Sequence, residues 1–283
     1  MQIAERLVPL RDAVTALREA GPLALVPTMG ALHDGHLTLV REARSRAAHV
    51  AVSIFVNPRQ FGAGEDLAAY PRPRTRDLDL LRGEGVSLVW APDVTEMYPA
   101  DYATNISVSG VSEGLCGTAR PGHFDGVATV VCMLFNQVLP DLALFGEKDW
   151  QQLAVIRRMA RDLDLTRPHV GNILGVPTLR EADGLAMSSR NAYLTPDERA
   201  RAAALPRAMR DAIAAIGAGE DIAQSLERLS QTLLAAGFPA VDYAQLCDAE
   251  TLAPLPARGN GPTRLLVAAR IGRARLIDNM AAA

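Results

Sequence analysis

The sequence predicts an α/β protein, in which a parallel sheet covered by helices on both faces precedes a smaller α+β domain. Short apolar runs alternate with amphipathic stretches through the first part of the chain, the pattern of repeated β-α-β units. Each run is apolar at successive positions, as expected of strands buried on both faces. The pattern of apolar and polar residues changes near residue 177, where long helical stretches and a hairpin pattern begin. We therefore expect domains at 1–177 and 178–283.

The elements of the first domain follow from these runs, taken in chain order. The expected strands, bounded mostly by glycine, proline or asparagine, are PLALV (22–26), VAVSIFV (50–56), VSLVWAP (86–92), DLALFG (141–146) and HVGNILGVP (169–177). Helices are expected where apolar residues recur at helical spacing. They are an N-terminal amphipathic stretch, a helix from Gly35 onward, and residues 76–85, 126–139 and 149–164.

The second domain has fewer and longer patterns. Residues 195–216 and 221–237 are predicted to be helical. Residues 241–250 and 264–279 read as strands, and Gly272 stands at the expected turn of a hairpin. This mixture of helices and antiparallel strands predicts an α+β unit.

Composition excludes several classes of protein. The 283 residues are 49% hydrophobic and 22% charged, and the formal net charge of −3 offers no basic field for a nucleic acid or an anionic membrane. No apolar run approaches the roughly 18 residues that span a bilayer, and Glu5 and Arg6 interrupt any signal-peptide core. Cys116, Cys132 and Cys247 form no CxxC pair. We expect a cytoplasmic protein with free thiols.

Polar clusters follow three of the five expected strands. PTMGALHDGH follows the first, NPRQF the second and GEKDWQQ the fourth. Ligands of open parallel sheets bind outside the carboxyl ends of the strands, where these clusters should meet. The sequence therefore predicts a binding site at that edge.

The first cluster has the features of an anion site. A glycine-containing turn opens a helix there, whose free amides and macrodipole favour negative charge. His33 and His36 add hydrogen-bond donors or cations, and Gly30 and Gly35 allow close approach of the backbone. The turn lacks both the P-loop and the GxGxxG pattern, so a turn with incidental histidines is the alternative. Asp34 reads as an exposed carboxylate at the helix start.

The other clusters offer further donors. Lys148 could neutralise phosphate charge, and Asp149 could cap a helix or hold sugar hydroxyls. The segment DGLAMSSRNAYL (183–194) is suited to polyphosphate oxygens. Asn57 and Gln60 could bind a hydroxyl or carboxylate, or cap a turn. Each segment taken singly could be an ordinary turn, helix cap or solvated loop. Together the segments predict a nucleoside triphosphate site beside a pocket for a small polar substrate.

Several motifs resemble those of a known family. HxGH at 33–36 resembles the HIGH signature of the nucleotidylyltransferase superfamily, and MSSR at 187–190 is similar to a degenerate KMSKS signature. More narrowly, PTMGALHDGH, FVNPRQF, YPR, GEKDWQQL, GVPTLREADGLAMSSRN and RLIDN resemble, in this order, the motifs of the pantothenate synthetase (pantoate–β-alanine ligase) family. The resemblance extends over nearly the whole chain.

The resemblance implies a fold and a reaction. Members of the family have a Rossmann-like N-terminal domain that binds ATP and pantoate, a smaller C-terminal domain that acts as a lid, and are usually homodimers. They condense (R)-pantoate with β-alanine, using ATP and Mg²⁺, to pantothenate, AMP and diphosphate through an enzyme-bound pantoyl adenylate. Small substrates, and neither nucleic acid nor membrane, are the implied partners.

The resemblance also implies roles for individual residues. His36 would be catalytic and would serve the α- and β-phosphates with His33. The β- and γ-phosphates would be held by Lys148, Ser188, Ser189 and Arg190, which complete the catalytic set. The rest of the ATP site would comprise Gly146 and Asp149 at the ribose, the backbone near Leu179 and Met187 at the adenine, and Pro27, Thr28, Met29, Gly30, Gly35 and Glu147.

The substrate and metal positions follow in the same way. Gln60 and Gln152 would bind pantoate and β-alanine, with Asn57 supporting them, and Asp77 would contribute to Mg²⁺ binding. Residues 61–72 are expected to form a flap that keeps water from the adenylate, and Arg120 and His123 are expected to face the pocket. Arg59, Arg74 and Arg76 depart from the family pattern in being basic, which weakens the metal assignment.

Three other readings stay open on the sequence. Another HxGH transferase would release a nucleotide-linked product. An aminoacyl-tRNA synthetase fits less well, because the chain is short, mildly acidic and without a basic or aromatic anticodon-binding region. A non-catalytic nucleotide-binding regulator is disfavoured, because every donor-type position that the chemistry needs is filled.

Overall fold

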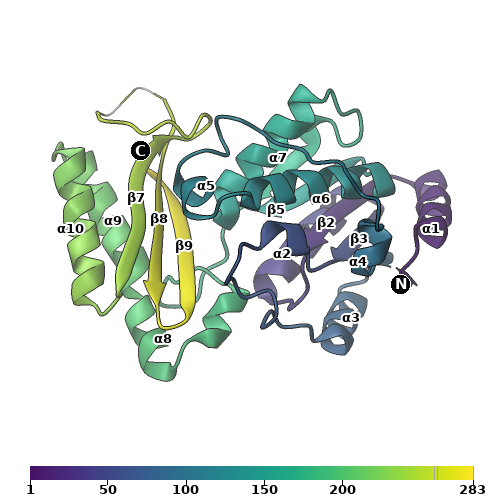
Figure 1. Ribbon diagram of the computed structural model, residues 1–283, viewed down its shortest axis with the longest axis horizontal. Helices are drawn as coiled ribbons and strands as arrows, with labels where there is room; N and C mark the ends of the chain where they lie inside the picture. The colour runs from purple at the N-terminus through teal and green to yellow at the C-terminus, as the bar shows by residue number, and fades with distance from the viewer. Residues whose placement is uncertain (258, 260, 283) are drawn as a thin grey trace.

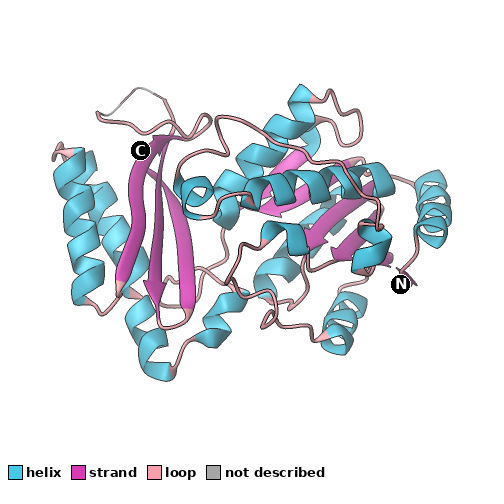
Figure 2. Ribbon diagram, viewed as in Figure 1, coloured by secondary structure: helices cyan, strands magenta, loops and turns pink. Residues whose placement is uncertain are grey.

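The computed structural model describes residues 1–257, 259 and 261–282. Two sheets organise this part of the chain (Figures 1 and 2). The first has six strands in the order β1-β4-β3-β2-β5-β6, all parallel, and the second has three antiparallel strands in the order β7-β8-β9. The predicted class, a Rossmann-like parallel sheet with a smaller α+β unit, is confirmed.

The elements as far as the last parallel strand are, in chain order, β1 (Gln2–Ala4), α1 (Leu7–Ala20), β2 (Leu23–Thr28), α2 (Asp34–Arg46), β3 (His49–Ile54), η1 (Pro58–Gln60), α3 (Arg74–Gly83), β4 (Leu88–Trp90), α4 (Val94–Met97), α5 (Leu115–Ala119), α6 (His123–Val138), β5 (Leu142–Gly146), η2 (Glu147–Asp149), α7 (Trp150–Asp162), η3 (Val170–Asn172) and β6 (Ile173–Val176). Those that follow are η4 (Ser189–Tyr193), α8 (Pro196–Ala202), α9 (Ala204–Gly217), α10 (Ile222–Ala235), β7 (Ala240–Asp248), β8 (Thr263–Ile271) and β9 (Ala274–Ala282).

All five expected strands of the first sheet exist, with differences at their ends. The fifth is shorter than expected, because residues 170–172 form a 3-10 turn that the His169 side chain caps by accepting the amide of Gly171. The edge strand β1 and the short helices α4 and α5 had no signal in the sequence. With three residues, β1 is too short for a pattern, and it is defined by its pairing with β4.

Strand β2 shows why the runs are apolar throughout. Its side chains alternate between two cores, Leu23 and Leu25 packing with α1, α6 and α7, and Ala24 and Val26 with α2 and α3. β2 pairs with β3 on one side and with β5 on the other. The strand order therefore reverses between β2 and β5, which is where open sheets of this type bind ligands.

The C-terminal unit packs two helices on one face of its sheet. In Figure 1, α9 and α10 lie along the outer side of β7–β9 and form the third core of the molecule with it. The expected helix over 195–216 is two helices, α8 and α9, which meet at Ala203; Pro206 is accommodated in the first turn of α9, where its missing amide costs little. The expected hairpin turn is confirmed: Gly272 has φ +52°, and a Cβ there would lie 2.3 Å from the Glu198 carboxylate.

The parallel sheet ends at Val176 and the next helical turn begins at Ser189. The domain boundary expected at 177/178 lies in this connecting segment. Among the helices of the described residues, none has the length and apolar character needed to cross a membrane.

Candidate active site

The turn between β2 and α2 holds the two histidines in a fixed arrangement. His33 is the N-cap of α2, and its Nδ1 accepts the amide of Gly35 at 3.1 Å. The His33 amide in turn faces Nδ1 of His36 at 3.4 Å, which completes a reciprocal cap of the helix. The two ring centroids are 4.1 Å apart. Both imidazoles are thus part of the helix start, with their orientations set by the backbone.

Their surroundings keep both imidazoles neutral. Burial, and secondarily the neighbouring His33, lower the pKa of His36 to about 3. Burial and the Lys148 ammonium also lower the pKa of His33. Because each Nδ1 faces a backbone amide donor, the proton of each neutral ring belongs on Nε2. Of the two options that the sequence left open, donor or cation, the structure favours neutral Nε2–H donors.

The turn that carries Lys148 is held in place by the C-terminal sheet. Lys148 follows β5 and has its Nζ 3.7 Å from an Asp149 carboxylate oxygen. Asn279 of β9 donates its side-chain amide to the carbonyls of Glu147 at 2.9 Å and of Lys148 at 2.8 Å. The RLIDN motif contains Asn279 but does not indicate its role. Its contact joins residues more than 130 positions apart, which no local pattern reveals.

The amide cluster after β3 is buried and internally bonded. The Asn57 amide donates to Gln60 Oε1 at 3.1 Å and to the carbonyl of Gly126 at 3.0 Å, and its oxygen accepts from Tyr98 Oη at 2.8 Å. Gln60 Nε2 lies 3.2 Å from the sulfur of Met29. Asn57 therefore orients Gln60. Among the described residues the Nε2 group of Gln60 has only this weak acceptor, so it is available to a ligand.

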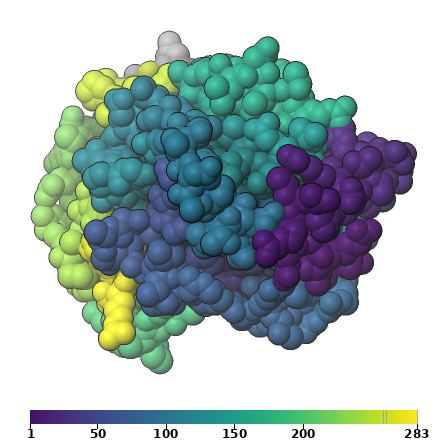
Figure 3. Space-filling model, turned by 45° about the vertical axis from the view of Figure 1, so that its right-hand side comes forward, coloured from purple at the N-terminus to yellow at the C-terminus, as the bar shows by residue number. Residues whose placement is uncertain are grey.

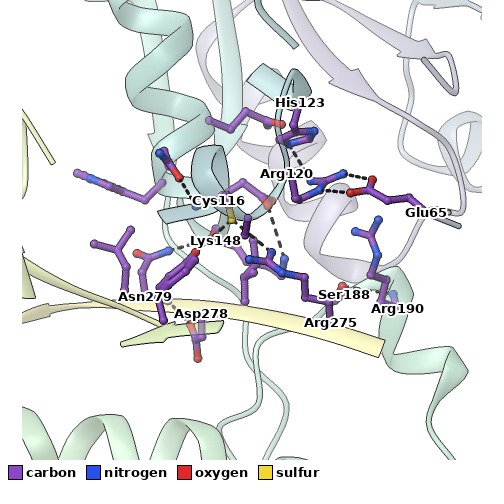
Figure 4. A pocket seen from close by; sticks show the side chains of 18 of the residues that line it. Glu65, Cys116, Arg120, His123, Lys148, Ser188, Arg190, Arg275, Asp278 and Asn279 are labelled. Atoms are coloured by element: carbon purple, nitrogen blue, oxygen red, sulfur yellow. Dashed lines mark hydrogen bonds and ion pairs between the residues drawn. The ribbon is translucent and has the colours of Figure 1, made fainter. Parts of the chain in front are cut away.

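Two ion pairs join the segment 61–72 to the walls of the site. Arg190 binds Asp66 through Nε at 3.2 Å and Nη2 at 3.1 Å. Arg120 binds Glu65 at 2.8 and 2.6 Å, and Figure 4 shows these side chains projecting into one cavity. His123 contacts both Arg120 Nη1, at 2.9 Å, and the carbonyl of Gln60, at 2.8 Å; burial and then Arg120 lower its pKa to about 4.

A cavity of about 220 Å³ lies beyond the ends of β2 and β5, and both histidines, Lys148 and the Asn57–Gln60 pair line it. The residues of the predicted site that line it are Pro27, Thr28, Met29, His33, Gly35, His36, Asn57, Gln60, Gly146, Lys148, Asp149, Gln152, Leu179, Met187, Ser188, Ser189 and Arg190, together with Arg120 and His123. Three described residues of the predicted set, Gly30, Glu147 and Asp77, lie outside its lining. Segments far apart in the sequence thus converge on one space.

One wall of the cavity is apolar and was missed by the sequence reasoning. It is formed by Val127, Val130, Val131 and Leu134 of α6, with Phe61 and Tyr70 from the segment 61–72. The spacing along α6 did predict a buried helix. It could not tell which of the buried positions face a cavity rather than a core.

A second cavity, of about 310 Å³, adjoins the first on the side of the C-terminal strands. The two share Arg120, His123, Lys148, Asp149, Gln152, Ser188 and Arg190. The lining of the second cavity also includes Arg270, Arg273 and Arg275 of the β8–β9 hairpin, and the carboxylates Glu65 and Asp66. Figure 3 shows yellow residues of these C-terminal strands beside blue residues from the first third of the chain.

No cluster of three or more histidine, cysteine, aspartate or glutamate side chains that could hold a metal ion occurs within the described residues. Asp77, the expected contributor to Mg²⁺ binding, is 1% exposed and accepts the backbone amides of Ala31 and Leu32 at 2.8 and 2.9 Å. The cysteines Cys116, Cys132 and Cys247 are free and buried. The metal role of Asp77 stays a prediction.

The fold and the cavity define a class of protein: an α/β protein with two neutral imidazoles, a lysine, an arginine and paired amides at the carboxyl edge of a parallel sheet. The family model "Pantoate-beta-alanine ligase" matches residues 2–281. The pantothenate synthetase of Novosphingobium aromaticivorans is 68% identical over 281 residues, which cover 99% of this chain and 98% of that protein.

Solved structures of pantothenate synthetases are also similar to this chain. The pantothenate synthetase of Thermus thermophilus superposes with a TM-score of 0.92 at 46% identity, covering 99% of both chains. The pantoate-β-alanine ligase of Francisella tularensis, a complex with β-γ ATP and β-alanine, gives 0.84 at 32% identity, covering 99% of this chain and 97% of that one. The chain belongs to the pantoate–β-alanine ligase family. Its reaction is the ATP-dependent condensation of pantoate with β-alanine.

Proposed function

We propose that the 220 Å³ cavity carries out this condensation in two half-reactions. In the first, a pantoate carboxylate oxygen attacks the α-phosphorus of ATP, and the bond to the β-phosphate breaks to release diphosphate. In the second, the neutral amine of β-alanine attacks the acyl carbon of pantoyl adenylate, the acyl–oxygen bond breaks, the nitrogen loses a proton to solvent, and AMP leaves. The observation that carries the proposal is the convergence of both histidines, Lys148, Arg190 and Gln60 on one space.

The charged and the neutral donors have different tasks in this scheme. His33 and His36 donate from Nε2 to oxygens of the α- and β-phosphates, where negative charge shifts toward the leaving diphosphate. Lys148, Ser188, Ser189 and Arg190 hold the β- and γ-phosphates. As neutral groups in a buried site, the imidazoles act by directed hydrogen bonds, and positive charge comes from Lys148 and Arg190.

The remaining walls suit the other parts of the substrates. Gly146 and Asp149 bind the ribose, and the backbone around Leu179 and Met187, which are joined by a 3.0 Å hydrogen bond, faces the adenine. Gln60 and Gln152 bind the polar groups of pantoate, and the apolar wall of α6 accommodates its two methyl groups. Asn57 acts through Gln60.

We infer that Mg²⁺ would be bound together with the ATP phosphates and would neutralise part of their charge. Mg²⁺ usually takes only one or two protein carboxylates in such sites, with the rest of its ligands from phosphates and water. That fits a site where Asp149 lies beside Lys148 and Asp66, in the adjoining cavity, is paired with Arg190. The chemistry it supplies when bound is stabilisation of the phosphate charge.

We infer that residues 61–72 form a flap and that residues 178–283 act as a lid. The support is that ion pairs of Asp66 with Arg190 and of Glu65 with Arg120, which phosphates could displace, join the segment to the walls of the site. Hydrogen–deuterium exchange tests the flap. We expect fast exchange over 61–72 in the free protein and slower exchange with ATP and pantoate bound; uniformly slow exchange in both states would contradict it.

We also propose that the enzyme is a cytoplasmic homodimer, as the family resemblance implies. Its three cysteines are buried and form no disulfide with one another, which suits a reducing compartment. Light scattering coupled to gel filtration tests the assembly: a mass near twice the 30.2 kDa of the chain is expected, and a monomer at micromolar concentration would contradict it.

The decisive experiment is a diphosphate-release assay with ATP, Mg²⁺ and pantoate, with β-alanine added or withheld. AMP and pantothenate should appear only with β-alanine. His36→Ala should slow the first half-reaction more than tenfold, a barrier change above about 1.4 kcal/mol. His169→Ala, at an exposed histidine that caps a 3-10 turn, is the matched control and should keep the wild-type rate. A His36→Ala rate within tenfold of wild type would show that the assigned role is wrong.

A further inference from the structure

Asp77 is a buried carboxylate that neither half-reaction uses. It lies in the first turn of α3 and is 1% exposed. Its Oδ2 accepts the amide of Ala31 at 2.8 Å and its Oδ1 the amide of Leu32 at 2.9 Å. These two amides belong to the residues immediately before His33. One side chain therefore connects α3 to the turn that presents the histidines.

The turn that Asp77 supports has an unfavourable backbone. Gly30 has φ +78° and Ala31 has φ +51°, in the left-handed region. For a residue with a side chain, such as Ala31, this conformation costs on the order of 1–2 kcal/mol and needs external support. Neighbouring amides of such a turn point into one concavity, which attracts an anion. Here the concavity is filled by the protein's own carboxylate.

We propose that Asp77 is a positioning residue for the reaction: by holding the amides of Ala31 and Leu32 it sets where His33 and His36 present their Nε2–H groups. The inference rests on the phosphate-binding role proposed above for the histidines. It competes with the role of Asp77 as a Mg²⁺ ligand. Both of its oxygens are already engaged by amide donors, and the side chain is closed off from the cavity.

The chemistry of the contact requires a carboxylate. Two amides both donate, so the partner must offer two acceptor oxygens in one plane. Asparagine offers one acceptor and an NH₂ group, so Asp77→Asn would leave one amide facing another donor. Glutamate keeps the charge but adds a methylene in a space already tight, since a Cβ on Gly30 would lie 3.0 Å from Asp77 Oδ2.

The test compares Asp77→Asn with Asp79→Asn, a control on the same helix whose side chain is 65% exposed. For each we would measure kcat and the KM values for ATP, pantoate and Mg²⁺. We expect kcat of Asp77→Asn to fall about tenfold or more at saturating substrates, from the loss of a charge-assisted hydrogen bond. The Mg²⁺ concentration for half-maximal rate should stay within about twofold of wild type. Asp79→Asn should behave as wild type.

Two results would overturn the proposal. One is a rate that high Mg²⁺ restores, which would make Asp77 a metal ligand; the other is an unchanged kcat in a folded Asp77→Asn protein. Should that variant not fold, amide exchange in the wild-type protein, free of nucleotide and Mg²⁺, decides. Slow exchange at Ala31 and Leu32 supports the contact, and exchange as fast as in an open loop refutes it. This readout is independent of His36→Ala, so failure of the histidine role would be recognised separately.

Discussion

Replacing Asp66 by asparagine should tighten ATP binding, because Asp66 occupies the arginine that we assign to the phosphates. The pair is bidentate, with N–O distances of 3.2 and 3.1 Å, and its two side chains are 25% and 27% exposed. A pair this open to solvent contributes about 1 kcal/mol. ATP must separate it before Arg190 can bind phosphate oxygens. Removing the pair in advance should therefore lower the dissociation constant for ATP by up to about fivefold.

Isothermal titration calorimetry with ATP and Mg²⁺ measures this change directly. Asp12→Asn, at an exposed acidic residue of α1, removes one negative charge without touching the site and serves as the control. A double-mutant cycle with Arg190→Met separates the ion pair from a general charge effect, since Asp66→Asn should gain little in that background. Weaker ATP binding by a folded Asp66→Asn protein, or an equal gain in both backgrounds, would refute the reasoning.

The remaining predictions concern stability. The unfolded chain holds His36 at its ordinary pKa near 6.5 and the folded chain at about 3. The unfolded state therefore binds more protons between these values, and stability is lost as pH falls from about 6.5 toward 3. Urea midpoints at pH 7 and 4.5 should differ less in His36→Gln than in wild type; equal differences would contradict this. Arg180→Met leaves the buried carboxylate of Asp278 without its 2.7 and 2.9 Å partner and should cost about 3 kcal/mol of unfolding free energy. Arg228→Met, at an exposed pair, should leave the unfolding free energy close to that of wild type in the same denaturation assay.

The parts of the fold that the sequence could predict are those with a local cause. The run around Leu25 is apolar because both faces of β2 are covered, and this is visible in five residues. The edge strand β1 has no such signal, since its position is defined only by the partner strand β4. The single helix expected over 195–216 is divided at Ala203, where continuous apolar periodicity hides the break.

In the candidate site, too, the features with a local cause could be predicted and those that depend on distant partners could not. The turn with His33 and His36 could be recognised because its residues are adjacent and their spacing is unusual. The contacts of Asn279, Asp66 and Asp77 could not, because each depends on a partner at least 45 positions away and on a side-chain direction that only the packed chain fixes. Motif reasoning therefore finds the groups expected to face substrates and the support that Asn57 gives to Gln60. It does not indicate the contacts of Asn279, Asp66 and Asp77.

The neutral state of His33 and His36 has a consequence for how the site divides binding from catalysis. A pair of buried imidazolium ions would attract ATP strongly in the ground state, and such uniform binding does not raise kcat. Neutral Nε2–H groups attract a phosphate oxygen weakly until charge develops on it during attack at the α-phosphorus, when a fixed donor gains most. In the proposed function Lys148 and Arg190, which line the same cavity, bind the β- and γ-phosphates and would hold ATP before and during the reaction. On this reasoning the histidines contribute mainly to kcat and the cations to both kcat and KM, a division that follows from burial of the imidazoles beside Lys148.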